Sequence, residues 1–420
     1  MKDKNIDISI FFLFIFVSII SIFTIYSAIF YDEKMLHYSF HIKQLIWTIL
    51  GIIISIIIAS FPPTFFSNIA YILYGISVFL LVILLAFNIV SHGVSRWFVL
   101  GPIKIQPSEF AKITTILAIA KYLNDKKLSV KKFKELMKHL FVVGLITSIP
   151  AALIIKQPDL GTSTVFFVIP PLMLYWAGLS IIDIIIIYSP FITSFISILG
   201  FIVYKLWIFW LIYFVIFSFI LIPNFIKKTK AKWIGISLII INTIIGILTS
   251  SLWNSLKDYQ KKRIVTFINP SADPYGAGYQ VIQSKIAVGS GGLFGKGWLN
   301  STQIRLDYLP EQHTDFIFAT YSEQFGFIGA IILLLLYFLI VFKIISIVKN
   351  SRDEFVNLYL IGFATYIVYH LFINIGMTIG IMPVTGLPLV LMSYGGSITL
   401  SMYIILGFIL SAIIYENKVK

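Results

Sequence analysis

Residues 309–342 read LPEQHTDFIFATYSEQFGFIGAIILLLLYFLIVF, and this stretch joins the two patterns that decide the fold. Three ionisable residues, Glu311, His313 and Asp315, stand directly before an apolar run from Phe316 to Phe342. An apolar run of this length can cross a hydrocarbon core about 30 Å thick as a helix. Ionisable groups at the mouth of a membrane helix are energetically costly, so their presence indicates a functional site.

The composition extends this pattern to the whole chain of 420 residues. Hydrophobic residues make up 59% of the sequence and charged residues 12%, against about 25% charged residues in a typical soluble domain. Apolar runs recur along the chain, and we see no series of the alternating strands that build a membrane barrel. The sequence therefore predicts an all-α polytopic membrane protein. Its first run, 8–30, is too long for a signal-peptide core and is expected to remain as a helix.

Two further counts exclude classes of function. The chain has no cysteine, which excludes disulfides and thiolate metal sites. A net charge of +14 would suggest nucleic acid in a soluble protein, but here most Lys and Arg residues lie in short loops, where they report topology. We therefore expect no nucleic-acid partner.

The apolar runs predict about twelve membrane spans. They lie near 8–30, 43–61, 66–90, 108–124, 138–156, 161–178, 181–203, 206–225, 233–252, 315–342, 356–380 and 396–415. With this count every basic cluster falls on one side, at 2–4, 126–138, 227–232, 343–352 and 418–420. Because positively charged loops stay in the cytoplasm, both termini are predicted to be cytoplasmic.

The segment 253–314 is the exception, because it carries many basic residues on the predicted outer side. Two readings stay open: the charges pair with acidic residues of the same loop, or they bind an anionic head group such as a lipid phosphate. The glycine-rich run 289–297 invites comparison with a nucleotide-binding loop. That interpretation fails, because Ser290 and Gly297 stand where the motif needs Gly and Ser/Thr. Tight turns at a membrane surface are the preferred interpretation.

Short polar motifs separate the apolar runs. They are Arg96-Trp97, Gln106-Pro107-Ser108-Glu109-Phe110-Ala111-Lys112, Gln157-Pro158-Asp159-Leu160-Gly161-Thr162, Gly276-Ala277-Gly278-Tyr279-Gln280, His313-Thr314-Asp315-Phe316-Ile317-Phe318-Ala319, Asn374-Ile375-Gly376 and Ser393-Tyr394-Gly395-Gly396-Ser397. In content and order these motifs resemble the SEDS family (shape, elongation, division and sporulation). The sequence departs from the family's E-E-x-G element, because only Glu323 precedes Gly326 there.

The resemblance implies a fold and a place within the family. A SEDS-type helical bundle has a core of ten spans, so the twelve predicted here imply a two-helix insertion within 179–232. The whole of 1–420 is then one integral membrane domain, with this insertion and a large extracytoplasmic loop at 253–314. The short N-terminus and Gln44-Leu45-Ile46-Trp47 resemble the RodA-like elongation branch, with the FtsW-like division branch as the alternative.

The resemblance also implies an activity, that of a peptidoglycan glycosyltransferase that polymerises lipid II. A sugar hydroxyl attacks an anomeric carbon, pyrophosphate leaves and the configuration inverts, which fits a single displacement with one general base. The essential aspartate of the family maps onto Asp315. From local sequence alone, Asp315 could instead be a helix N-cap. Glu311 and His313 could tune or orient the base, or form a turn set by Pro310.

Further residues are candidates for binding or support. Candidate cations for the pyrophosphate or the lipid-linked glycan are Arg263, Lys285 and Lys296, with Arg96 as a further candidate. Glu109 and Lys112 have i, i+3 spacing, which fits either a role near the family's central cavity or an intrahelical ion pair. Asp159 has either a functional role or a helix-capping role. A divalent cation, Mg²⁺ or Mn²⁺, is plausible on the pyrophosphate, its identity is unknown, and no organic cofactor is expected.

The expected setting is the bacterial inner (cytoplasmic) membrane. The resemblance implies a class B penicillin-binding protein as partner, which crosslinks the strands, together with other elongation-complex proteins. A lipid II flippase or transporter is the rival, and it should carry charges spread through its spans on both leaflets. A purely structural scaffold would leave Asp315 dispensable.

Overall fold

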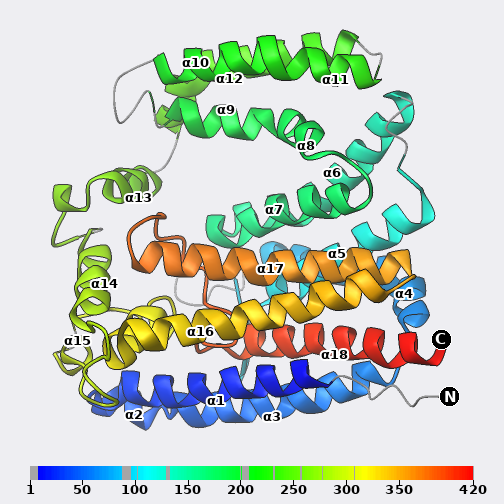
Figure 1. The fold of residues 1–420 in the computed structure, drawn as a ribbon. Helices are drawn as coiled ribbons and strands as arrows, with labels where there is room; N and C mark the ends of the chain where they lie inside the picture. The colour runs from blue at the N-terminus through cyan, green and yellow to red at the C-terminus, as the bar shows by residue number, and fades with distance from the viewer. Residues whose placement is uncertain are drawn as a thin grey trace. The chain divides into compact units, whose positions relative to one another are not determined.

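The computed structural model describes residues 8–87, 96–101, 103–128, 133–198, 200, 208–229, 232–255, 258–276, 278–306 and 308–419. These ranges are mainly helical (Figure 1). The chain divides into two compact units. The first comprises Met1–Asp125, Leu145–Met173 and Tyr279–Lys420, and the second comprises Lys126–Gly144 and Leu174–Gly278.

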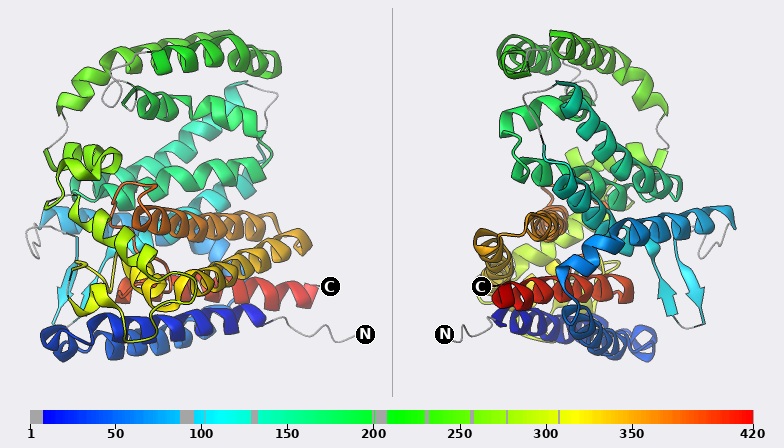
Figure 2. Two further views of the ribbon diagram at one scale, coloured as in Figure 1. Left: turned by 60° about the vertical axis from the view of Figure 1, so that its left-hand side comes forward. Right: turned by 90° about the vertical axis from the view of Figure 1, so that its right-hand side faces the viewer.

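The first unit is built from long helices that pack side by side. Its main helices are α1 (Ser9–Ile29), α3 (Phe40–Ala59), α4 (Pro63–Ala86), α5 (Pro107–Asp125), α7 (Leu160–Trp176), α16 (Ile317–Asn350), α17 (Glu354–Thr378) and α18 (Gly396–Val419). Helix α18 packs along α3, α16 contacts both α1 and α17, and α5 contacts both α4 and α17 (Figure 2). Shorter elements are α2 (Glu33–His37), α14 (Tyr279–Ser290), α15 (Thr302–Arg305) and an antiparallel hairpin of β1 (Phe98–Leu100) and β2 (Ile103–Ile105). Helix α6 (Phe133–Lys156) runs from the second unit into the first.

Small residues and buried tyrosines hold these helices together. A side chain on Gly51 of α3 would collide with the ring of Tyr403 on α18, and one on Gly407 of α18 would lie 2.7 Å from Ile58. Small residues of this kind let membrane helices approach closely. The hydroxyl of Tyr403 also shares a 3.0 Å hydrogen bond with Ser18 of α1. Such bonds satisfy polar groups that would otherwise be costly to bury.

The second unit contains shorter and interrupted helices. They are α8 (Ile181–Ile187), α9 (Ser189–Ile198), α10 (Ile208–Ile216), the π-helical η2 (Phe217–Leu221), α11 (Ile222–Thr229), α12 (Lys232–Ser255), α13 (Asp258–Ile268) and the 3₁₀ turn η3 (Pro270–Ala272). The fully buried amide of Asn242 on α12 bonds to the hydroxyls of Ser189 and Thr193 on α9. This polar contact fixes how α9 and α12 pack.

The predicted spans agree with the helices, and the all-α polytopic class is confirmed. Each of the twelve predicted segments contains helix, and in the described part of the chain seven helices are long and apolar enough to cross a membrane. The segment 181–203 is interrupted between α8 and α9 at Tyr188, shortly before Pro190. The assignments of 179–232 as an insertion and 253–314 as an extracytoplasmic loop stay predictions. Within 253–314 the described residues form α13, η3, α14 and α15.

The glycine-rich run joins the backbone of α16 rather than forming only surface turns. Gly326 has φ 65° and ψ −164°, which breaks α16 between its first turns and its long apolar part. There Phe327 N–H donates to the carbonyl of Gly292, and Gly297 N–H donates to that of Gln324. A Cβ on Gly326 would collide with the backbone of Leu293 and Gly295. Glycine is therefore needed here for close approach of two backbones.

Candidate active site

Asp315 lies in a tight turn directly before α16. The backbone amides of Thr314 and Phe316 both donate to the carbonyl of Glu311, at 3.2 Å each. Helix α16 begins at Ile317 with Phe316 in the N-cap position, so Asp315 stands one residue before the cap. Asp315 is partly exposed, while Phe316 is buried. The turn is therefore held in the core by Phe316, and Asp315 lies at the partly exposed start of α16.

The loop 379–395 lies against this turn. Gly386 has φ +75°, and a side chain at that position would begin 3.4 Å from Oδ2 of Asp315. The hydroxyl of Ser393 donates to the carbonyl of Thr314 at 2.7 Å. On the other side of the loop, Gly161 at the start of α7 packs directly on the carbonyl oxygen of Thr385. The carboxylate of Asp315 therefore faces backbone that carries no side chain at Gly386.

Asn374 near the end of α17 connects the two loops. Its side-chain nitrogen donates to the carbonyl of Asp315 at 2.9 Å and to the carbonyl of Leu387 at 2.9 Å. Asn374 is fully buried. Helix α14 contacts the end of α17, where the hydroxyl of Ser284 donates to the carbonyl of Thr378 at 2.8 Å.

His313 and Glu311 shape the turn. The ring of His313 stacks on Phe40, with 4.8 Å between ring centroids and a 12° angle between planes. Burial lowers the pKa of His313, although the nearby Glu311 carboxylate opposes the shift. Glu311 is exposed, has φ 55°, and accepts a 2.7 Å hydrogen bond from the hydroxyl of Thr314. These contacts agree with supporting roles for both residues, which stay predictions.

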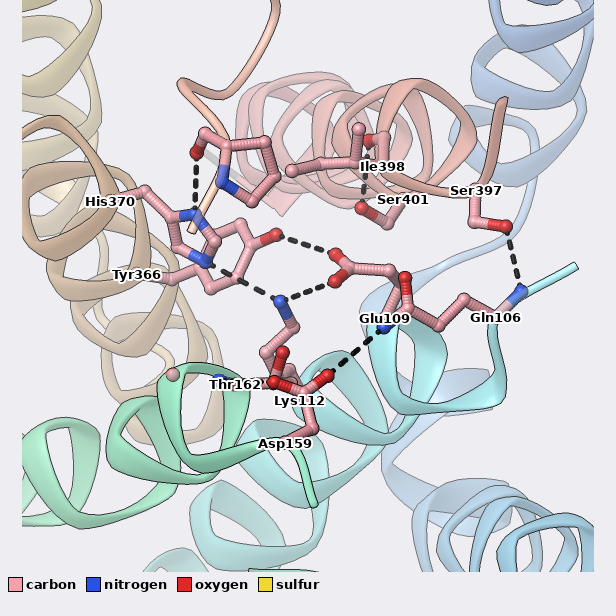
Figure 3. Close-up of polar contacts among 12 residues, drawn as sticks. Gln106, Glu109, Lys112, Asp159, Thr162, Tyr366, His370, Ser397, Ile398 and Ser401 are labelled. Carbon is pink, nitrogen blue, oxygen red and sulfur yellow. Dashed lines mark hydrogen bonds and ion pairs between the residues drawn. The ribbon is translucent and has the colours of Figure 1, made fainter. Parts of the chain in front are cut away.

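Glu109 and Lys112 form a buried ion pair at the start of α5 (Figure 3). The side chains are 4% and 0% exposed, and Nζ of Lys112 lies 2.8 Å from Oε1 of Glu109. Tyr366 of α17 donates to Oε2 of Glu109 at 3.2 Å, and Nζ of Lys112 lies 3.4 Å from Nε2 of His370. The predicted i, i+3 pair is therefore present, and α17 completes its hydrogen bonding.

Arg96 and Asp159 hold the turn before α7. Arg96 donates to the carbonyls of Gln157, at 3.1 Å, and Pro158. Its guanidinium also lies 3.8 Å from the carboxylate of Asp159. Asp159 accepts from the amide of Thr162 at 3.2 Å, which is the contact of a helix N-cap. The capping role of Asp159 is confirmed, and Arg96 organises this turn.

The remaining candidate cations differ in their surroundings. Nζ of Lys296 lies 2.7 Å from the fully buried carboxylate of Glu323, which also accepts from Ser301 and Thr302. Lys296 therefore fastens the glycine-rich run to α16. Lys285 is exposed on α14, and its stem crosses Gly380 at the end of α17. In the described part of the chain its ammonium group has neither an ion-pair nor a hydrogen-bond partner. Arg263 lies on α13 of the second unit, and its side chain is outside the described residues.

Several helix ends therefore meet around Asp315. The start of α5 bonds to the start of α18 through the amide of Gln106 and the hydroxyl of Ser397, at 2.8 Å. The start of α7 packs on loop 379–395, and the start of α16 carries Asp315. Helix N-termini carry partial positive charge, so this end of the first unit favours an anionic ligand.

Comparison with known proteins agrees with this arrangement. The model of the cell cycle protein family of FtsW, RodA and SpoVE matches residues 7–214 and 210–418. The chain belongs to this family. It is 34% identical to peptidoglycan glycosyltransferase MrdB of Escherichia coli K12, over 86% of this chain and 82% of that one. It is 32% identical to peptidoglycan glycosyltransferase RodA of Treponema pallidum, over 88% and 89%.

A solved structure extends the likeness to the fold. It concerns structural coordination of polymerization and crosslinking by a peptidoglycan synthase complex. One chain of that structure is 26% identical to this protein, with a TM-score of 0.69. The match covers 98% of this protein and 99% of that chain. As a member of the SEDS family, the protein is a multi-pass membrane protein.

Some residues of this SEDS site were not singled out from the sequence. Asn374 occurred in a family motif without a role, and His370 was not among the candidate residues. Their spacing of four residues inside an apolar helix was the available signal, because polar side chains in a membrane helix usually have a purpose. Ser393 and Tyr366 gave no comparable local signal.

A protein-held metal does not fit the described donors. Within the ranges that the structure describes, no group of three or more His, Asp or Glu side chains is placed to hold an ion. We therefore derive no step through a metal that the protein binds by itself. A Mg²⁺ or Mn²⁺ ion carried by a pyrophosphate stays a prediction.

Proposed function

We propose that this SEDS protein is a peptidoglycan glycosyltransferase that polymerises lipid II into glycan strands during cell elongation. The observation that carries the proposal is the partly exposed Asp315 directly before α16, whose carboxylate faces Gly386. The family's named relatives are peptidoglycan glycosyltransferases, which supports the reaction class.

In the proposed reaction, Asp315 is the general base. The carboxylate takes the proton of the acceptor sugar's hydroxyl while that oxygen forms a bond to the anomeric carbon of the donor. The bond between that carbon and the pyrophosphate oxygen breaks, and its electron pair leaves with the pyrophosphate. A general base of this kind contributes about 10²- to 10⁴-fold to a rate. The single displacement inverts the configuration, as formation of a β-linkage from an α-linked donor requires.

The leaving pyrophosphate needs positive charge rather than an acid. Of the proposed cations with described side chains, Lys296 is engaged by Glu323 and Arg96 by the 157–159 turn. Lys285 is exposed and without such a partner, at the end of α17 where loop 379–395 begins. We assign the pyrophosphate contact first to Lys285, with the helix N-termini adding to the positive field.

Two other functions make different demands on the site. A lipid II flippase should carry charges spread through its spans on both leaflets, whereas Glu109 and Lys112 lie together at the start of α5 and Asp315 directly before α16. A scaffold would not need a partly exposed carboxylate at this position. Polymerisation in division rather than elongation would use the same site, and it differs in where the protein acts in the cell.

The proposed setting follows from the family. The protein lies in the bacterial cytoplasmic membrane with both termini in the cytoplasm, as the basic clusters predict. A class B penicillin-binding protein and other elongation-complex proteins are the proposed partners.

The test is polymerisation of purified lipid II by the protein together with its penicillin-binding partner. We expect the Asp315→Ala variant to make strands at least about 100-fold more slowly than the unmodified protein. Strand synthesis at the unmodified rate would remove Asp315 as the base. If neither protein makes strands but lipid II changes leaflet in liposomes, the transporter reading replaces the enzyme. Localisation at midcell instead of the side wall would favour the division role.

A further inference from the structure

Two buried polar side chains on one face of α17 bind consecutive carbonyl groups of the loop that faces Asp315. His370 and Asn374 are four residues apart, so they project from the same face of the helix. Both are fully buried. Asn374 binds the carbonyl of Leu387, and His370 binds the carbonyl of Pro388 at 2.9 Å. The segment next to Gly386 is therefore fixed at two adjacent points.

The chemistry of Asn374 makes it a bridge between loops. Its two acceptors are both backbone carbonyls, on Asp315 and Leu387, and a carbonyl can only accept a hydrogen bond. The side-chain nitrogen must therefore face both of them and uses one hydrogen for each. The planar amide of Asn374 thus sets the separation between the backbones of Asp315 and Leu387.

The state of His370 is fixed in the same way. Because its Nδ1 faces the carbonyl of Pro388, Nδ1 must carry the proton. Its Nε2 then accepts from the ammonium group of Lys112, 3.4 Å away (Figure 3). Lys112 is held in turn by Glu109. A continuous series of polar contacts therefore runs from the buried ion pair of α5 to the loop under Asp315.

We infer that Asn374 is a positioning residue for Asp315 and that His370 supports the same loop from the buried ion pair. The inference rests on the proposed role of Asp315 as the base. Asn374 touches the backbone of Asp315 and not its carboxylate, so it acts by placing the residue rather than by sharing its proton. A displacement of a reacting group by about 1 Å can lower a rate on the order of 100-fold. Loss of the bridge should therefore lower kcat and change KM little.

Lipid II polymerisation by the full-length protein with its partner tests this inference in two variants. Asn374→Leu keeps the side-chain size and removes both donors, and we expect kcat to fall about 10- to 100-fold with KM within about threefold. Asn374→Asp keeps the shape but places an acceptor against two carbonyls, so its kcat should fall at least as far.

The control is Asn357→Leu on the same helix. Asn357 also donates through its side-chain nitrogen to a backbone carbonyl, that of Ser351, at 3.2 Å. It lies 17 residues before Asn374, or about 25 Å along the helix axis. We expect its kcat to stay within about twofold of the unmodified protein.

A second pair of variants serves if both Asn374 variants fail to fold. His370→Phe removes the donor to Pro388, and His370→Asn can restore it because its side-chain nitrogen takes the place of Nδ1, so kcat should fall in the first and partly recover in the second. Size-exclusion chromatography in detergent identifies folded variants.

The outcomes separate this inference from the proposed function. If Asp315→Ala is inactive while folded Asn374→Leu has an unchanged kcat, the positioning role is wrong and the base assignment stands. A rise in KM without a fall in kcat would also overturn it, because Asn374 would then affect binding alone. If Asp315→Ala is fully active, the proposed base falls and the positioning role falls with it.

Discussion

Replacing Lys112 by Met should destabilise the protein strongly, because it leaves the charge of Glu109 buried without its counter-ion. Both side chains are almost completely buried, and their charged groups lie 2.8 Å apart. Removing one member of such a pair costs about 3–5 kcal/mol. The hydrogen bond from Tyr366 to Glu109 is present before and after the substitution, so it does not change this difference. We therefore expect the free energy of unfolding to fall by about 3–5 kcal/mol.

The double variant Glu109→Gln with Lys112→Met provides the comparison. It removes both charges, and replacement of a whole buried pair by neutral groups is often close to neutral in stability. The double variant should therefore be more stable than Lys112→Met alone, with a coupling energy of about 2 kcal/mol. Unfolding of the purified proteins in mixed micelles with increasing SDS measures these differences. A loss below about 1 kcal/mol for Lys112→Met, or a double variant no more stable than the single one, would refute the reasoning.

Three further predictions concern the turn, the glycine-rich run and the two loop lysines. Burial lowers the folded-state pKa of His313, so its contribution to stability is present above the ordinary pKa of about 6.5 and is lost as pH falls towards the lowered value. Melting temperatures measured between pH 5 and 8 should therefore drop on the acid side. The drop should be smaller in His313→Phe. Gly326→Ala should cost at least about 2 kcal/mol through its positive φ and its backbone collision, whereas Gly289→Ala, with open space around it, should be near neutral in the same unfolding assay. Lys285→Ala should lower kcat/KM for lipid II without loss of stability, because the leaving pyrophosphate loses its cation. Lys296→Ala should instead lower the melting temperature, and the reverse pattern would exchange their roles.

The sequence was sufficient to predict the long apolar helices, because the thickness of the bilayer sets the length of each apolar run. It did not predict α13, α14 and α15, which lie in the segment expected to be a loop. Every predicted span contains helix. Details that depend on backbone geometry could not be foreseen. The break of α16 at Gly326 arises because residues 291–297 bond to its backbone, and nothing in the apolar run itself reveals that contact. The β1–β2 hairpin was missed for a similar reason, since each strand has only three residues.

The candidate site was predictable where contacts are local. The i, i+3 pair of Glu109 and Lys112 and the cap formed by Asp159 follow from spacing alone. The partners supplied by other helices do not. Tyr366 meets Glu109 across 257 residues of sequence, and Asn374 meets the carbonyl of Asp315 across 59. Such contacts are set by helix packing, so one sequence can suggest that a polar residue in a span matters without identifying what it touches.

The surroundings of the charged residues also explain how one end of a helical bundle can be both rigid and reactive. Glu109 and Glu323 both have buried carboxylates that pair with lysines. The pair of Lys296 and Glu323 fastens the glycine-rich run to α16, and the pair within α5 is held to α17 by Tyr366 and His370. Since separating a buried pair is costly, these segments resist displacement when a charged substrate approaches. In contrast to these buried pairs, Asp315 is partly exposed and Lys285 is exposed. Both contact loop 379–395, at Gly386 and Gly380. A base that must act at a defined distance from its substrate gains more from such fixed surroundings than from an additional charge of its own.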